Sequence, residues 1–201
     1  MPHTSDVAFS PAVKAVQQRL GSRDHFARRP DWPTEATDEL EQFLGAATSV
    51  FLATASAAGQ PYIQHRGGPK GFLQLIDRRT IGFADFAGNR QYITLGNLGE
   101  NPQAMLFVMD YETRRRVKLW GRARVIEDDP ALVARLFPAG YAARGERAVL
   151  FEIAAWDVNC RQHIPQLFPA VEVLPALDAM DQRIRALEAE NAELRRQLQA
   201  G

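Results

Sequence analysis

Between Thr48 and Trp156 the spacing of apolar residues changes from a helical period to short strand-like stretches, some of which alternate apolar and polar residues. The alternation is clearest from Arg116 to Val125, where every second residue is apolar or small and those between are mostly basic. That period places one face of a strand on a core and the other in solvent. Stretches rich in β-branched and aromatic residues, each bounded by a turn, predict further strands at residues 48–55, 62–66, 72–76, 80–84, 104–109 and 148–153. Because hairpin turns join most of them, we expect a mostly antiparallel barrel.

Apolar residues at helical spacing flank and interrupt these strands. Ser10-Pro11 has the form of a cap followed by a first helical residue, and acidic residues from Glu35 onward open a second helix, as the helix dipole favours. Shorter helices are expected at residues 91–98 and 130–137. The sequence therefore predicts three parts: a helical extension at 1–47, a barrel domain at 48–170 and a C-terminal amphipathic or coiled-coil helix at 171–201.

The C-terminal helix carries an apolar stripe whose members recur at alternating steps of three and four. They are Leu177, Met180, Ile184, Leu187, Asn191, Leu194 and Leu198. Such a heptad stripe requires a partner surface. Two partners stay open: a second copy in a coiled coil, where Asn191 would pair with its symmetry mate, or the protein's own barrel.

The balance of charge narrows the range of partners. Lys plus Arg and Asp plus Glu both total 24, so the net charge is zero and no global field attracts nucleic acid or an anionic membrane. The basic run from Arg114 to Arg116 is therefore interpreted as a dimer face or a solvated strand. The apolar runs are too short to span a membrane, and the N-terminus lacks the order of a signal peptide. With one cysteine, Cys160, and four histidines without metal-ligand spacing, we expect a cytoplasmic protein and no metal site.

Two glycine-containing segments carry candidate chemistry. In the segment from His65 to Gly71, glycines stand between two cations, so the backbone N–H groups can approach a flat or anionic ligand closely. In the segment from Phe83 to Gln91, Asn89 and Arg90 stand at the start of an expected helix, a position that favours phosphate. The alternative for each segment is a solvated hairpin loop.

At this point the chain resembles the pyridoxamine 5′-phosphate oxidase-like FMN-binding split barrels, from about Ser49 to Val158. The motifs that carry the resemblance are Phe51-Leu-Ala-Thr54, Gly59-Gln-Pro61, His65-Arg-Gly-Gly-Pro-Lys-Gly-Phe72, Asp85-Phe-Ala-Gly-Asn-Arg90, Asn101-Pro102 and Trp120-Gly121-Arg122. A flavin-nucleotide-binding subgroup of that family is the most similar. The resemblance implies a six-stranded antiparallel split barrel and a homodimer with two FMN molecules in clefts shared by its chains.

The same resemblance implies a cofactor site. Its residues toward the phosphate and ribityl chain would be Arg66, Lys70, Asn89 and Arg90. The backbone of residues 66–70, which includes Gly67 and Gly68, and the Asp85 side chain would lie along the isoalloxazine ring. His65 and Trp156 are further candidate flavin neighbours, although a tryptophan at the edge of the core is the commoner arrangement.

Departures from the family pattern affect the expected activity. The oxidases proper carry an adjacent Arg-Lys pair where this chain has Arg90-Gln91, and the residues that hold pyridoxal phosphate have no convincing equivalent. The sequence therefore predicts an FMN-dependent oxidoreductase for a small molecule other than pyridoxamine 5′-phosphate, with a nicotinamide cofactor as a transient electron donor. The alternative is a non-catalytic flavin or small-ligand binding protein, a sensor or carrier. His163 is the candidate proton donor, with a structural loop histidine as its alternative, and Cys160 is a redox thiol only if its pKa is lowered.

Overall fold

The computed structural model describes residues 3–158 and 161–200, so the prediction for Cys160 lies outside the described residues. The chain forms two compact units. The first consists of Met1–Asp110 and Arg115–Gln162, and the second of Tyr111–Arg114 and His163–Gly201. The first unit contains the whole sheet and the candidate site.

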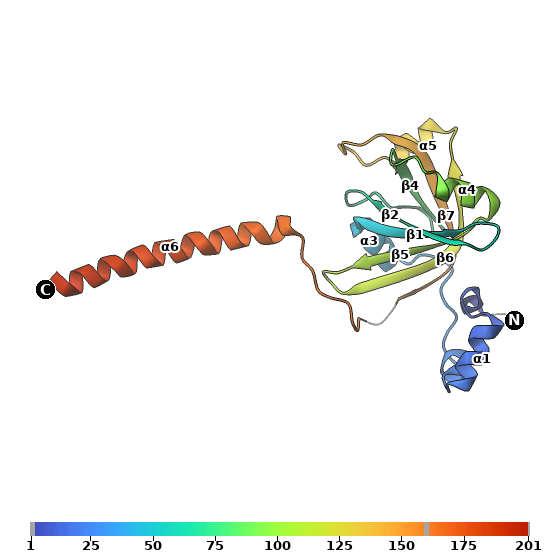
Figure 1. Cartoon of the computed structure of the whole chain (residues 1–201), viewed down its shortest axis with the longest axis horizontal. Coiled ribbons are helices and arrows are strands. Elements are labelled where there is room, and N and C mark those ends of the chain that lie inside the picture. Colours follow the sequence, from blue (N-terminus) through green and yellow to red (C-terminus); the bar gives the residue numbers. More distant parts are fainter. Residues whose placement is uncertain (1–2, 159–160, 201) are drawn as a thin grey trace. The chain divides into compact units, whose positions relative to one another are not determined.

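The described residues form one sheet of seven antiparallel strands that curls around a core (Figure 1). The strands are β1 (Ser49–Ala55), β2 (Pro61–Gly67), β3 (Gln74–Asp77), β4 (Thr80–Phe86), β5 (Gln103–Asp110), β6 (Arg115–Ile126) and β7 (Gly145–Val158). Their order is β2-β1-β5-β6-β7-β4-β3, which leaves β2 and β3 at the two ends. The predicted mostly antiparallel fold with flanking helices is confirmed. Each stretch predicted from the sequence pattern forms a strand, so the sheet has one strand more than the six implied by the resemblance.

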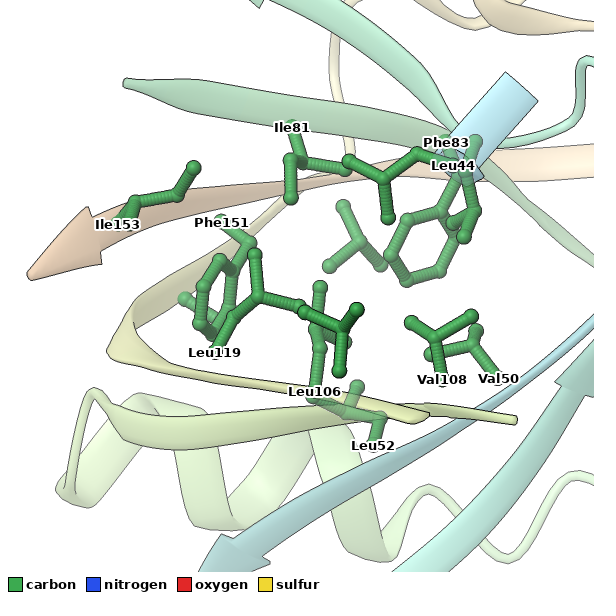
Figure 2. Close-up of a cluster of buried hydrophobic side chains, with 14 of the residues drawn as sticks. Leu44, Val50, Leu52, Ile81, Phe83, Leu106, Val108, Leu119, Phe151 and Ile153 are labelled. Carbon is green, nitrogen blue, oxygen red and sulfur yellow. The ribbon is translucent and has the colours of Figure 1, made fainter. Parts of the chain in front are cut away.

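The alternation in β6 is realised as predicted. Val117, Leu119 and Ala123 are buried, while Arg122 and Arg124 on the other face are exposed. Inward side chains of the other strands join them in one core, where β1, β4, β5 and β7 contribute large apolar groups (Figure 2). Burying such side chains removes apolar surface from water, which contributes about 1.5–3 kcal/mol for each one.

Helices precede, interrupt and follow the strands. They are a short 3₁₀ helix (Thr4–Val7), α1 (Pro11–Arg19), α2 (Arg23–Ala27), α3 (Asp38–Ala46), α4 (Ile93–Glu100), α5 (Pro130–Leu136) and α6 (Ala170–Ala200). Ser10, Thr37 and Asp129 cap α1, α3 and α5, because each side chain accepts a hydrogen bond from a backbone N–H three residues later. The sequence predicted a helix at residues 91–98, whereas the corresponding helix, α4, covers Ile93–Glu100.

The N-terminal extension contacts β6 and β7. Trp32 stacks on Trp120 of β6, with ring centroids 4.8 Å apart and planes 21° from parallel. Trp156 of β7 donates two hydrogen bonds to this segment, from its backbone N–H to the Pro33 carbonyl and from its indole N–H to the Glu35 carbonyl, both at 3.0 Å. The extension therefore belongs to the same compact unit as the sheet.

The second unit consists of α6 and the segment before it, together with the β5–β6 turn. The backbone N–H of Leu167 donates to the carbonyl of Tyr111 at 3.2 Å, and the Gln166 amide donates to the carbonyl of Glu112 at 2.9 Å. No helix within residues 3–158 and 161–200 is both long enough and apolar enough to cross a bilayer.

Candidate functional site

A cleft in the first unit is lined by β2, β4, β7 and the loop that leads from β4 into α4. Its charged lining residues are Arg66, Asp85, Arg90, Glu146 and Arg147. Arg66, Asp85 and Arg90 come from the two glycine-containing segments that the sequence singled out. The structure therefore brings both segments to one site.

Arg66 and Asp85 form an ion pair across the cleft. Arg66 is on β2 and Asp85 on β4, and these strands are not neighbours in the sheet. Their side chains are only 17% and 12% exposed, so water screens the pair weakly. The pair uses one terminal nitrogen of Arg66, whereas its Nε atom is buried and has no hydrogen-bond partner within the described chain. An unsatisfied buried donor is costly unless a ligand or a water completes it.

Arg147 and its neighbour Glu146 are the charged cleft residues that the sequence reasoning missed. Arg147 lies on β7 opposite Asp85 in the β4–β7 register, and its Nη1 atom is 3.4 Å from the Asp85 carboxylate. Burial opposes the charge of Arg147, but the carboxylates of Glu127, Asp85 and Glu146 together raise its pKa above the ordinary value. Its guanidinium also lies over the Tyr92 ring, 5.1 Å from the centroid. Asp85 is therefore shared by two guanidinium groups.

The loop before α4 adopts an uncommon backbone conformation. Arg90 and Tyr92 have φ angles of 58° and 53°, a left-handed region that non-glycine residues rarely enter. Such local strain persists only where the surrounding structure enforces it, and it is concentrated at functional sites. The Oδ1 atom of the Asn89 side chain accepts a hydrogen bond from the backbone N–H of Gln91 at 3.1 Å, which stabilises the turn. Asn89 and Arg90 thus line the cleft from a loop and not, as predicted, from the start of a helix.

Arg90 differs from the other two cleft arginines in its pairing. Arg66 and Arg147 both pair with carboxylates, whereas Arg90 has no ion pair or hydrogen bond within residues 3–158 and 161–200. Its side chain is exposed at the cleft. Arg90 is therefore available to bind an anion.

The other predicted residues of the first segment do not line this cleft. His65 is exposed on β2, and its Nε2 atom is 2.9 Å from the Ser49 hydroxyl. Gly68 has a structural reason to be glycine, because a Cβ there would come 2.7 Å from the side chain of buried Phe72. A Cβ at Gly67 would come 3.0 Å from the His65 ring, which would have to shift slightly. Lys70 is exposed in the turn that follows β2. Their contact with a flavin stays a prediction.

Trp156 and His163 also lie outside the cleft lining. Trp156 packs against the core and directs its indole N–H to Glu35, which accords with the alternative of a tryptophan at the core edge. His163 is exposed in the second unit, with a φ angle of 62°. Their proposed functional roles stay predictions.

Residues 36–161 match the sequence profile of the family described as pyridoxamine 5′-phosphate oxidase. The chain belongs to the pyridoxamine 5′-phosphate oxidase family. The match covers β1 to β7 and therefore every strand that lines the cleft. Curated proteins show no match to the sequence.

Solved structures similar to this member of the pyridoxamine 5′-phosphate oxidase family share little sequence with it. HupZ of Group A Streptococcus is 17% identical, with 66% of this chain and 99% of that chain covered and a TM-score of 0.49. An FMN-binding protein from Syntrophomonas wolfei is 12% identical, with coverages of 74% and 95% and a TM-score of 0.46. HutZ of Vibrio cholerae, described as a heme storage protein, is 15% identical, with coverages of 60% and 91% and a TM-score of 0.40.

Proposed function

We propose that the cleft binds FMN and that the protein is an FMN-dependent oxidoreductase acting on a small molecule other than pyridoxamine 5′-phosphate. The observation that carries the proposal is the pair of unsatisfied cationic donors at one cleft, the buried Nε of Arg66 and the unpaired guanidinium of Arg90. A phosphate accepts hydrogen bonds from guanidinium groups in a fork geometry that suits both. Membership of the pyridoxamine 5′-phosphate oxidase family supports FMN as the ligand.

The balance of charge in the cleft fits an anionic ligand. Three arginines and two carboxylates contribute to its lining, which leaves one net positive charge. Asp85 neutralises much of Arg66 and Arg147, so Arg90 supplies the free charge. Arg66 would donate its Nε–H toward the ligand while Asp85 holds its position.

The residues of this chain would bind and orient the cofactor. Bound FMN supplies the redox chemistry that amino-acid side chains lack. Arg90 and Arg66 would hold its phosphate, and the buried hydroxyl of Thr94, which donates to Gln64 at 3.0 Å, fixes a polar wall of the cleft. Neither arginine can donate a proton at neutral pH, so proton transfer would require another group. His163, the candidate from the sequence, lies outside the cleft lining, so its role in proton transfer stays a prediction.

A homodimer with shared clefts is part of the proposal. Ile63 is 59% exposed on β2, the edge strand that also carries Arg66. A second copy against this edge would bury Ile63 and would cover the flank of the cleft. A separate part of the proposal is the transient electron donor, which would be a nicotinamide cofactor that enters the cleft from solvent.

A visible absorption spectrum of the purified full chain mixed with FMN tests the proposal. Bound FMN should show a shifted and structured absorption band, and anaerobic addition of NADH or NADPH should bleach it. A bound flavin that neither nicotinamide reduces would favour the alternative, a non-catalytic flavin carrier or sensor. Absence of FMN binding at micromolar concentration would overturn the proposal.

A further inference from the structure

Helix α6 carries an apolar stripe whose side chains are exposed in the single chain. The six apolar members of the stripe are between 43% and 84% exposed. They are Leu177, Met180, Ile184, Leu187, Leu194 and Leu198. The stripe begins just after Pro175, which interrupts the helical hydrogen-bond ladder near the start of α6. It runs to the last turn of a helix that is about 46 Å long at 1.5 Å per residue.

The spacing assigns these positions to a heptad. Steps of three and four alternate throughout, which places Leu177, Ile184, Asn191 and Leu198 at a positions, and Met180, Leu187 and Leu194 at d positions. Leucine at d together with a single asparagine at an a position favours two parallel strands. The Asn191 amide can then pair with the same amide of the second helix, which fixes the register at a cost in stability.

The residues that flank the stripe are complementary between two copies in that register. The g positions hold Arg183 and Glu190, and the e positions five residues later hold Glu188 and Arg195. In a parallel in-register pair, each g side chain faces the e side chain five residues later on the other helix. Arg183 would therefore face Glu188, and Glu190 would face Arg195, twice each in the dimer. Every one of these contacts joins opposite charges.

Two ion pairs form within α6, and neither involves a residue of the proposed charged contacts between helices. Arg185 pairs with Asp181 at 2.8 Å, and Arg196 pairs with Glu193 at 2.8 Å. Arg185, Glu193 and Arg196 lie at b, c and f positions, away from the stripe, whereas Asp181 is at an e position that faces the uncharged g residue Ala176. In contrast, the residues of the proposed charged contacts, Arg183, Glu188, Glu190 and Arg195, form no ion pair within residues 3–158 and 161–200. The charges of these proposed contacts are therefore unpaired in the single chain.

The opposite orientation of two helices suits these residues less well. In an antiparallel pair, a positions face d positions, so Asn191 would face Leu187 and its amide would lose its partner. In that alignment e positions face e positions and g positions face g positions. Asp181 would face Arg195, but Glu188 would face Glu188 and Glu190 would face Glu190. Like charges at such distances are destabilising.

We propose that residues 177–198 of α6 form a parallel, in-register, two-stranded coiled coil with α6 of a second copy of this chain. The partner is thus another α6, and the pairing is independent of whether the cleft binds FMN. Two chains joined at α6 have a high effective concentration of their other surfaces. The coiled coil would therefore keep two copies together at low protein concentration.

Disulfide trapping in the full chain tests the orientation. In a Cys160→Ser background, Met180→Cys and Leu198→Cys chains of different tagged size are mixed in a glutathione redox buffer. A parallel in-register pair brings equal core positions within disulfide reach, so each variant should link only to itself. Links between position 180 and position 198, which face each other when Asn191 faces Leu187, would show an antiparallel pair and overturn the proposal. Arg196→Cys, at an f position, is the matched control and should give a linked fraction lower by about tenfold.

Exchange of the flanking charges tests the register separately from any contact between barrels. Glu188→Lys/Glu190→Lys makes every g–e contact basic, and Arg183→Glu/Arg195→Glu makes every contact acidic. In the Cys160→Ser/Leu198→Cys background, each variant alone should lose about tenfold in linked fraction, and a mixture of the two should recover it as a mixed dimer.

Unchanged linking in the separate charge variants would overturn the proposed register. An absence of linking at position 198 in the unchanged helix would show that the stripe has another occupant, such as the protein's own barrel or a different protein. The substituted charges lie on the surface of α6, so the variants should fold as the original chain does.

Discussion

Arg66 and Asp85 form an ion pair between β2 and β4, two strands that no backbone hydrogen bond connects. The sheet order places β2 at one end and β4 next to the other end, so the pair spans the opening of the curled sheet. Its position at the cleft means that one contact serves both the closure of the fold and the shape of the site.

Asp85→Asn should destabilise the protein, because two poorly hydrated guanidinium groups would lose their shared carboxylate. We expect a loss of about 1–3 kcal/mol in the free energy of unfolding, measured by urea denaturation at pH 7. The control is Arg144→Gln, which removes an exposed arginine from its pair with Glu146 and should cost at most about 1 kcal/mol. Equal losses for the two variants would contradict this role of Asp85.

Arg90→Ala should weaken FMN binding by about 10- to 100-fold, because a charge-assisted bond to phosphate contributes roughly 1.5–3 kcal/mol. Riboflavin lacks the phosphate and should lose far less. Fluorescence titration of both flavins against both proteins measures the difference. Arg124→Ala is the control, since Arg124 is an exposed arginine on β6 that does not line the cleft, and it should leave the affinity for both flavins unchanged. Equal losses for FMN and riboflavin would remove Arg90 from the phosphate site.

Pyridoxamine 5′-phosphate should not be turned over by the protein supplied with FMN. Where the oxidases proper carry an Arg-Lys pair, this chain has Arg90-Gln91, and the groups that hold the substrate phosphate lack a convincing equivalent. Hydrogen peroxide release is the measurement. Steady release on adding micromolar pyridoxamine 5′-phosphate would show that other residues of the chain hold this substrate.

Asp157→Asn should stabilise the protein at neutral pH. Burial raises the pKa of the Asp157 carboxyl above its ordinary value, and Lys118 and Arg29 offset this only in part. A carboxyl that holds its proton more tightly in the folded chain stabilises the fold below its unfolded-state pKa. That contribution is lost as the pH rises through the folded-state pKa.

At pH 7 the free energy of unfolding of Asp157→Asn should therefore be higher than that of the original chain. The difference between the two proteins should shrink as the pH falls toward 3. Urea denaturation across this range measures it. Asp128→Asn, at an exposed position, is the matched control. A difference that grows as the pH falls would have the wrong sign and would contradict the prediction.

The sequence alone was sufficient for all seven strands and for the longer helices, because their signals are local, whereas it missed the 3₁₀ helix (Thr4–Val7) and α2 (Arg23–Ala27). Alternation in β6 depends on neighbouring residues, and the predicted cap at Ser10 depends on atoms three residues apart. The stripe on α6 is equally local, since it follows from the helical repeat. These patterns need no knowledge of distant contacts.

Only the tertiary structure decided which charges share the cleft. Asp85 is 19 residues from Arg66 and 62 from Arg147 in the sequence, and the register of β4 with β7 sets Arg147 opposite Asp85. Nothing local separates Arg147 from Arg144, which is exposed beside Glu146. The glycine-rich motif identified Arg66, but its partners depend on how the sheet curls. A polar site joins residues from distant strands, so a local pattern can nominate its members without showing which of them meet.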